Sequence, residues 1–313
     1  MSLITSDSDK GSQDKWSYRA LPLGQIFKTD RFDVDVTDLT FGLGSDGNYS
    51  KTIEDKSCRK IVLATMVSIL RSKIPIRGAT AKASVLHSSE TELTHMIKLN
   101  TKPTTEHLTP ELRLNLITPS CPLWKAPYTE VPFSDPFWAF YWPGGQVISR
   151  YILDNPKTVY GKRVLDFGCG SGACGIAAAK AGASKVILND VDPVACLAAN
   201  LNAEENRVSA STEICSDDYL SASEDGGLPG WDLVLVGDMF YDESFASVMY
   251  NWLTSSLSRR RGRCSALIGD PGRHALSSAI KSKLSKVADY SLPENCCLEN
   301  RGFSSAVVWK LDV

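Results

Sequence analysis

Acidic side chains follow several apolar runs of this chain, at the points where buried strands would end. They are Asp166, Asp190, Asp217, Asp238 and Asp270. A carboxylate at such a point can hold an ammonium group, accept hydrogen bonds from hydroxyl and amino groups, or orient an amine. The sequence therefore predicts a site that binds a small polar ligand and positions a nucleophile beside it.

Asp166 opens the string Asp-Phe-Gly-Cys-Gly-Ser-Gly-Ala, in which Gly168 and Gly170 let the backbone approach a ligand closely. The same letters match the G-x-G-x-x-A fingerprint of dinucleotide-binding proteins, and Asp190 lies at a suitable distance to hold ribose hydroxyls. They also read D-x-G-x-G-x-G, which resembles the S-adenosylmethionine loop of seven-stranded methyltransferases. A methionine ammonium favours a carboxylate such as Asp166, whereas a pyrophosphate needs free N–H groups. No tyrosine has a lysine four residues later, as the common short-chain dehydrogenase dyad requires, so S-adenosylmethionine is the favoured cofactor.

Further cofactor contacts are predicted from position. Asp190 would accept hydrogen bonds from both ribose hydroxyls. Asp217 would bind the adenine amino group, and the plainer alternative for the pair is that Asp218 is a solvated surface acid. Trp142, in a dense aromatic run and beside Pro-Gly-Gly, suits the rim of the pocket, while Trp138 suits either the core or a substrate wall.

The string Gly-Asp-Met-Phe-Tyr at 237–241 is the candidate reacting end. A lysine amine, with an ordinary pKa of about 10.4, must lose a proton before it attacks a methyl group. Asp238 can orient that amine, and Phe240 and Tyr241 can line a narrow channel that tolerates a methylated ammonium. Core packing is the alternative for both aromatic residues. Asp270 can assist substrate binding, although a plain Asp-Pro-Gly turn explains it nearly as well.

These residues need a scaffold that brings strand ends together. Short apolar runs alternate with helical stretches, which predicts an α/β fold with a parallel sheet covered on both faces and the ligand at the carboxyl ends of its strands. A helix is expected to start near Ala173, another to end near Leu153, and Asp192 before Pro193 is expected to be a helix N-cap. The predicted strands are 163–168, 185–190, 212–217, 231–238, 264–270 and 305–311.

The composition argues against several classes of protein. The 313 residues carry 34 basic and 36 acidic side chains, a net charge of −2, which gives no global warrant for binding nucleic acid or an anionic membrane. The nine cysteines form no CxxC pair, so reduced thiols and no structural metal are expected. No apolar run approaches the roughly 20 residues of a membrane span, and we expect a soluble protein.

The amino-terminal third differs in composition. Residues 1–65 are predicted to be a disordered extension, because they hold few periodic apolar positions. Between Lys56 and Ser89 there is no Asp or Glu, and the basic, serine-rich segment 66–90 has the composition of a mitochondrial transit peptide that would begin at Met66. A basic surface helix is the alternative. Residues 91–313 are expected to form the catalytic domain.

The strings SDPFWAFYWPGGQVISRYILDNP (134–156), NDVDPVA (189–195), LVGDMFYDE (235–243) and LIGDPGR (267–273) sharpen the resemblance. With the Asp-x-x-Tyr tetrad of Asp238 and Tyr241, the chain resembles the seven-stranded protein lysine methyltransferases. Within them it is similar to the branch that methylates the electron transfer flavoprotein β-subunit. The resemblance runs from about Leu108 to the end, and the loop GCGSGA also looks like the ribosomal-protein lysine methyltransferases.

The resemblance implies a Rossmann-like seven-stranded sheet and a mitochondrial matrix enzyme that tunes electron transfer from dehydrogenases by methylating lysines. It also implies cofactor contacts at Trp142 and the residues named above, and catalysis by Asp238 and Tyr241. Alternatives are another acceptor such as a ribosomal protein, a nicotinamide-dependent oxidoreductase, and a non-catalytic cofactor-binding partner. If the transit-like segment is misread, the cytoplasm is the expected compartment. An enzyme acting on a folded protein has no need to self-associate, and a monomer is expected.

Overall fold

The computed structural model describes residues 89–126, 131–133, 136–221, 230–294 and 302–313. The predicted extension and nearly all of the transit-like segment lie outside the described residues. The elements, in chain order, are α3 (Glu90–Asn100), β1 (Lys102–Thr104), β2 (Leu114–Leu116), α4 (Pro122–Lys125), η3 (Phe137–Ala139), α5 (Pro143–Asp154), η4 (Pro156–Thr158), β3 (Arg163–Phe167), α6 (Ala173–Lys180), β4 (Lys185–Asn189), α7 (Pro193–Glu205), η5 (Ser209–Ser211), β5 (Thr212–Cys215), β6 (Leu233–Gly237), α8 (Glu243–Arg259), β7 (Ser265–Asp270), α9 (Ser278–Lys281), β8 (Ser285–Ser291) and β9 (Ser305–Leu311).

Seven strands form the main sheet in the order β5-β4-β3-β6-β7-β9-β8. The five from β5 to β7 are parallel, and β9 pairs antiparallel with both β7 and β8. The prediction of an α/β fold with a seven-stranded sheet is thus confirmed. The predicted parallel arrangement holds for these five strands, whereas β9 lies between β7 and β8 and runs antiparallel to both.

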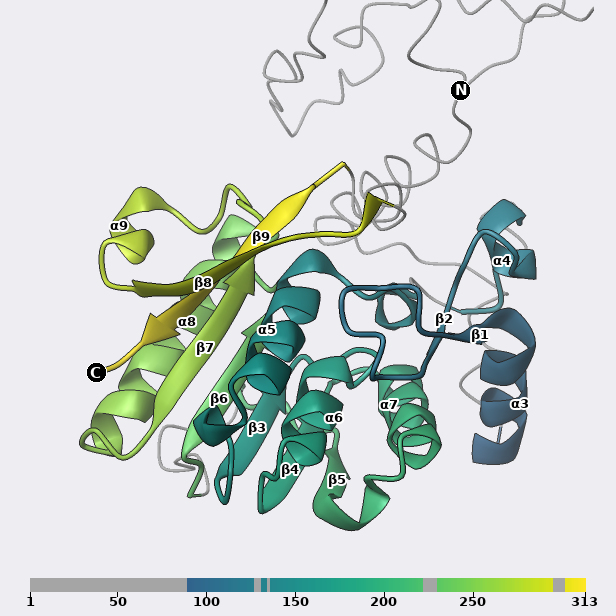
Figure 1. The fold of residues 1–313 in the computed structure, drawn as a ribbon, viewed down its shortest axis with the longest axis horizontal. Helices are drawn as coiled ribbons and strands as arrows, with labels where there is room; N and C mark the ends of the chain where they lie inside the picture. Colours follow the sequence, from purple (N-terminus) through teal and green to yellow (C-terminus); the bar gives the residue numbers. More distant parts are fainter. Residues whose placement is uncertain (1–88, 127–130, 134–135, 222–229, 295–301) are drawn as a thin grey trace, which may run out of the picture. The chain divides into compact units, whose positions relative to one another are not determined.

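Both faces of the sheet are covered, which explains why its central strands are almost wholly apolar. Successive residues of β3 alternate between two cores: Val164 packs with α5 and α6 residues, whereas Leu165 and Phe167 pack with α8 residues such as Met249. Figure 1 shows α5, α6 and α7 on the near face and α8 behind the sheet. The central strands are therefore held from both sides, and their carboxyl ends are rigidly placed.

The strand order reverses at β3. The chain runs from β3 outward to β4 and β5, then returns to place β6 on the other side of β3 (Figure 1). Ligands of open α/β sheets bind at such a switch point, outside the carboxyl ends of the strands. The loops after β3 and β6 meet there.

The start of α5 packs backbone to backbone against this edge. A Cβ at Gly144 would lie 2.1 Å from the Gly269 carbonyl oxygen and 2.5 Å from the Asp238 amide nitrogen. Only glycine permits this approach, which brings the residues before α5 to the ends of β6 and β7.

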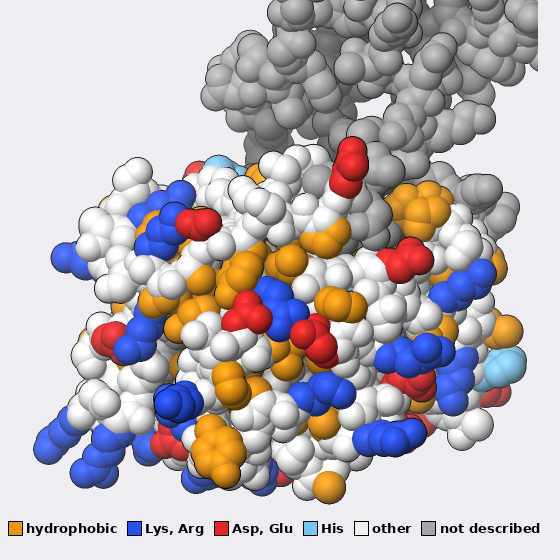
Figure 2. Space-filling model, in the orientation of Figure 1, with side chains coloured by type: hydrophobic (Ala, Val, Ile, Leu, Met, Phe, Trp, Pro, Cys, Tyr) orange, Lys and Arg blue, Asp and Glu red, His pale blue; other side chains and the backbone are white. Residues whose placement is uncertain are grey.

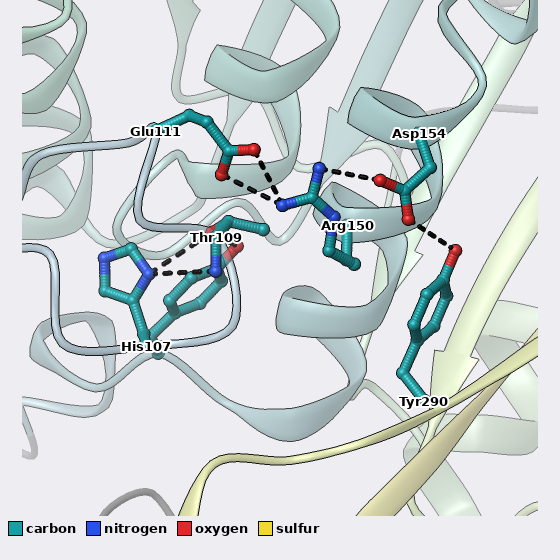
Figure 3. Close-up of polar contacts among 7 residues, drawn as sticks. His107, Thr109, Glu111, Arg150, Asp154 and Tyr290 are labelled. Atoms are coloured by element: carbon teal, nitrogen blue, oxygen red, sulfur yellow. Dashed lines mark hydrogen bonds and ion pairs between the residues drawn. The ribbon is translucent and has the colours of Figure 1, made fainter.

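Elements before α5 attach to the domain by several contacts. Helix α3, which has a capping box between Ser89 and Glu92, shares a small core with α7 that includes Ile97 and Ala198. On α5, Arg150 lies between Glu111 and Asp154, with Nη–Oε1 and Nη–Oδ1 distances of 2.8 Å (Figure 3).

Arg150 is one part of a longer chain of polar contacts. The Tyr290 hydroxyl of β8 donates to Asp154 at 3.1 Å (Figure 3). In the segment before β2, Thr109 bonds His107 Nδ1 at 3.3 Å through both its amide and its hydroxyl. Burial lowers the pKa of His107 to about 4, so its ring is neutral at pH 7. Through Glu111 and Tyr290, helix α5 is tied to the segment before β2 on one side and to β8 on the other.

The near face mixes both signs of charge, with Lys and Arg interspersed among Asp and Glu over α5, α6 and α7 (Figure 2). In the ranges described above, no helix is long and apolar enough to cross a membrane.

Candidate active site and cofactor pocket

A small pocket lies at the switch point predicted from the strand order. Its walls come from the loop after β3, the first turns of α5 and α6, and the end of β6. The lining residues are Phe140, Tyr141, Trp142, Gly145, Asp166, Gly168, Cys169, Gly170, Ser171, Ala173, Cys174 and Gly237. Four residues predicted to contact the cofactor, Trp142, Asp166, Gly168 and Gly170, therefore share one cavity.

The loop after β3 follows the conformation that its glycines permit. Gly168, Gly170 and Gly172 have φ values of +63°, +51° and +78°. A Cβ at Gly168 would lie 2.5 Å from the Met239 Cε, so the side chain after Asp238 covers this glycine. Helix α6 then begins at Ala173, as predicted from the sequence. A loop of this shape presents backbone to a ligand without side chains in the way.

Asp166 is the acidic group of the pocket. Its side chain is 2% exposed, and Oδ2 accepts a hydrogen bond of 2.7 Å from the Gly175 amide. Burial raises the pKa of Asp166 to about 7, an effect that the Gly175 bond reduces and the Asp190 charge increases. Among the described residues no Lys or Arg pairs with Asp166. A ligand cation would supply the missing partner.

The Asp190 side chain accepts a hydrogen bond from the backbone of the glycine loop and so helps to fix its conformation. Its Oδ2 accepts from the Gly170 amide at 3.0 Å and its Oδ1 from the Asp192 amide at 3.0 Å. Burial raises the pKa of Asp190. Asp192 in turn accepts from the Val194 amide at 2.8 Å, which confirms its predicted role as the N-cap of α7.

Asp217 lies at the surface after β5. Its carbonyl oxygen accepts a hydrogen bond of 2.9 Å from Asn189 Nδ2, and its side chain is exposed. Its neighbour Asp218 closes a turn with Ser221, whose hydroxyl bond lowers the pKa of Asp218. The structure does not bring Asp217 into the pocket described above, and its contact with adenine stays a prediction.

The aromatic run before α5 divides between pocket and core. Trp142 is the residue that precedes α5, with Pro143 at the first helical position, and its Nε1 donates to the Phe137 carbonyl at 2.9 Å. Trp138 is 4% exposed and packs edge-on against Phe133, with ring centroids 5.3 Å apart. Of the two roles left open for Trp138, the structure selects the core.

Asp238 has an unexpected arrangement. Its backbone is left-handed, with φ +61°, and its carboxylate points inward. Oδ2 accepts from the Gly144 amide at 2.9 Å, and Oδ1 accepts from Arg273 Nε at 2.6 Å. The carboxylate thus caps the amino end of α5 and pairs with an arginine, whereas the sequence suggested only an amine-orienting role.

The two aromatic residues after Asp238 separate. Phe240 is fully buried in the core under α8, so its predicted place along a substrate channel is corrected to core packing, the alternative already considered. Tyr241 is 53% exposed, and its ring stacks on Phe245 with centroids 5.4 Å apart. Of the pair, only Tyr241 is available to an incoming protein.

Asp270 forms an Asp-Pro-Gly turn, which the sequence predicts as the alternative to a role in substrate binding. Its Oδ1 accepts from the Gly272 amide at 2.7 Å and from the Arg273 amide at 2.9 Å. Its Oδ2 is buried and has no hydrogen-bond partner among the described residues, and burial raises the pKa of Asp270 to about 6. The carboxyl group is only 1% exposed, so a substrate contact at Asp270 stays a prediction.

Sequence reasoning missed several residues of the site. Met239, Arg273 and Gly144 take part through contacts between segments far apart in the chain, and no local pattern marks such contacts. The string Ile-Gly-Asp-Pro-Gly-Arg at 268–273 ends in Arg273, but nothing local in it indicates that this arginine pairs with Asp238. Within the described part of the chain, no group of three or more His, Cys, Asp or Glu side chains could hold a metal ion.

Comparisons with known proteins agree with this geometry. The family model of ribosomal protein L11 methyltransferase (PrmA) matches residues 150–298. The human electron transfer flavoprotein beta subunit lysine methyltransferase is 46% identical over 220 residues, covering 70% of this chain and 81% of the human protein. The Danio rerio protein of the same name is 42% identical over 224 residues, covering 71% of this chain and 84% of that protein.

Among solved structures, the magnesium protoporphyrin IX methyltransferase of Synechocystis with bound SAM has a TM-score of 0.40 at 18% identity, covering 54% of this chain and 79% of that chain. The sheet order, the glycine loop and the pocket define a methyltransferase of the seven-stranded, S-adenosylmethionine-dependent class. The chain belongs to the electron transfer flavoprotein beta subunit lysine methyltransferase family. That membership removes the nicotinamide-dependent alternative.

The residues present fit S-adenosylmethionine. The pocket holds the buried carboxylate of Asp166, which pairs with no cation in the described ranges and suits the ammonium of the methionine moiety. Beside it, Gly168 and Gly170 line the same pocket and bring backbone without a side chain to its wall.

Proposed function

We propose that this protein transfers methyl groups from S-adenosylmethionine to lysine side chains of the electron transfer flavoprotein β-subunit. The observation that carries the proposal is 46% identity to the human enzyme of that name over 81% of its length. The pocket at the switch point supports it, because it joins the glycine loop, Asp166 and Trp142 in one cavity.

When bound, the cofactor supplies an activated methyl group. The task of the chain is therefore to bind and orient, since an in-line displacement gains most from alignment of the two reactants. Asp166 would hold the ammonium group, Gly168 and Gly170 would admit the ligand to the backbone, and Trp142 would close one wall. Asp190 would contact the ribose through acceptor positions that its two backbone bonds leave open, and Asp217 would contact the adenine.

The acceptor lysine must reach the pocket as a neutral amine. Asp238 uses two of its roughly four acceptor positions for Gly144 and Arg273, so its carboxylate can still accept a hydrogen bond from an amine. Tyr241, three residues further along the chain, is exposed and is proposed to contact the substrate. Each of these assignments predicts a loss of turnover on substitution, with the fold retained.

We further propose that the enzyme works in the mitochondrial matrix. The transit-like composition that begins at Met66 and the compartment implied by a flavoprotein substrate support this independently of each other. Methylation retains the charge of a lysine while removing hydrogen-bond donors, and is therefore expected to weaken electron transfer from dehydrogenases that dock there. Fractionation of cells that express the tagged full chain tests the compartment, and a tag found only in the cytosol would reject it.

The direct test is transfer of labelled methyl into purified electron transfer flavoprotein, beside a total mitochondrial extract. Asp238→Asn and Tyr241→Phe serve as matched variants, each checked for binding of S-adenosylhomocysteine by calorimetry. Label on the β-subunit that both variants lose supports the substrate and the two residues together. Label only on other proteins rejects this acceptor and keeps the chemistry. If cofactor binding is intact and no label appears anywhere, the protein is a non-catalytic binder.

A ribosomal protein is the second candidate acceptor, because the L11 methyltransferase model matches residues 150–298. That match takes in the glycine loop and the segment with Asp238 and Tyr241, so it does not by itself distinguish the two acceptors. Purified ribosomal subunits belong in the same assay, and label there in place of the flavoprotein would select this candidate.

A further inference from the structure

Arg273 lies where three segments of the site meet. Its Nε donates to Asp238 Oδ1 at 2.6 Å, and the two side chains are only 10% and 2% exposed. The other oxygen of Asp238 accepts from the Gly144 amide at the start of α5. One buried charge pair therefore connects the loops after β6 and β7 with the first turn of α5.

The guanidinium group of Arg273 also lies near two aromatic rings. Its Cζ is 5.8 Å from the centroid of the Trp142 ring and 5.0 Å from that of Phe303, just before β9. Both distances fall within the range of cation–π attraction. Trp142 lines the pocket and Arg273 does not, so Arg273 reaches the pocket through its contacts.

The backbone around this pair is held by further bonds. Asp238 adopts a left-handed φ of +61°, which is costly for a residue with a side chain, and its amide donates to the Gly269 carbonyl at 2.9 Å. The Arg273 amide donates to Asp270 Oδ1 at 2.9 Å. Strain of this kind persists where surrounding contacts over-determine it, and here those contacts aim the Asp238 carboxylate at Arg273 and Gly144.

We propose that Arg273 is a positioning residue of the cofactor pocket, acting through Asp238 and Trp142. By neutralising the buried Asp238 carboxylate, it keeps that side chain on the Gly144 amide. The pocket wall formed by Trp142 and Gly145 is then held against the end of β6. The proposal rests on the proposed function, because it takes this pocket to be the binding site of S-adenosylmethionine.

The test measures binding of S-adenosylhomocysteine by calorimetry, which needs no acceptor. Arg273→Ala is expected to raise the Kd about tenfold or more, and Arg273→Lys, which keeps the charge, to recover part of the loss. Added guanidinium ion, at a concentration too low to denature, should strengthen binding to Arg273→Ala and leave the wild type unchanged. Arg113→Ala, which removes a pair with Glu205 on the surface, is the matched control and should bind like the wild type.

A double-mutant cycle tests the route through Asp238. If Arg273 acts through that carboxylate, Arg273→Ala should cost much less in an Asp238→Asn background than in the wild type. A purely stabilising role would lower the melting temperature while leaving the Kd of the folded protein unchanged, and that result overturns the proposal. So would fully additive losses, or weaker binding on addition of guanidinium.

A wild-type protein that does not bind S-adenosylhomocysteine would instead reject the proposed function, which keeps the two failures separate. Should Arg273→Ala fail to fold, Arg273→Gln and Arg273→Lys carry the test. Equal Kd values for glutamine, lysine and the wild type would then overturn the positioning role.

Discussion

Asp166 is buried and lines the cofactor pocket. Binding of a cationic ligand there is therefore expected to release the proton that Asp166 carries at low pH. Its pKa is raised from the ordinary value of 3.8 to about 7 because burial disfavours the carboxylate. The folded protein therefore binds this proton more tightly than the unfolded chain does. It follows that Asp166 makes folding less favourable as the pH rises from about 4 to about 7.

A ligand ammonium beside Asp166 should favour the ionised form and expel the proton. Binding of S-adenosylhomocysteine is accordingly expected to strengthen as the pH rises from about 5.5 to about 7.5, by up to about tenfold per pH unit. Calorimetry at pH about 6.5 in two buffers of different ionisation enthalpy measures the released proton. Asp166→Asn should bind more weakly and show neither effect. A pH-independent Kd in the wild type would contradict a contact between Asp166 and the ammonium.

Residue types at the site could be foreseen from the sequence, whereas their partners could not. The glycine spacing after β3 and the acid before it follow from local backbone requirements, and the structure brings Asp166, Gly168 and Gly170 to one pocket. The partners of Asp238, Gly144 and Arg273, come from positions 94 and 35 residues away. Only the folded chain reveals that this carboxylate caps a helix.

At the scale of elements, the close packing of α5 against the sheet depends on Gly144. A methyl group at Gly144 would overlap backbone atoms of β7 and the loop after β6, which cannot move away as a side chain can. Gly145, the next residue of the same helix, would place its Cβ 3.5 Å from a Tyr141 ring atom, an ordinary contact.

Gly144→Ala is therefore expected to lower the free energy of unfolding by about 3 kcal/mol or more, and Gly145→Ala by less than about 1 kcal/mol. Urea denaturation of both variants measures the difference. Similar transition midpoints for the two would show that α5 can shift away from the sheet at little cost.

The N-cap of α7 is expected to make a smaller, separate contribution to the stability of the protein. Asp192 accepts from the Val194 amide, so Asp192→Ala should destabilise the protein by about 1 kcal/mol, while Asp192→Asn should retain most of the cap. Thermal unfolding at neutral pH distinguishes the two variants. Equal loss in both would mean that the charge of Asp192, and not its hydrogen bond, is what stabilises the helix.

The elements that could be predicted are those with a strong hydrophobic pattern. Strands β3, β4, β6 and β7 are nearly continuous apolar runs, because both of their faces are buried. Strand β8 was missed: its sequence SKVADYS lies at the edge of the sheet, mostly exposed or half-buried, and has no such run. The three-residue strands β1 and β2 are too short to carry any period.

At the scale of the whole molecule, α5 is the element that joins the parts. It contacts the sheet through Gly144, the segment before β2 through Arg150 and Glu111, and β8 through Asp154 and Tyr290 (Figure 3). The pocket wall begins in the same helix. Contacts that fix α5 therefore also fix the pocket, although several of them lie far from it.

The described hydrophobic cores draw their buried members from Ile97 to Leu311. A chain that begins at Val85 thus retains every one of these contacts, and it should match the full chain in melting temperature and in Kd for S-adenosylhomocysteine. A chain that ends at Ser304 lacks β9, which pairs with both β7 and β8, and should not fold cooperatively. Calorimetric unfolding and ligand titration of the three chains make the comparison. A clear loss of stability in the chain that begins at Val85 would mean that residues before it belong to the folded domain, contrary to the predicted boundary near residue 91.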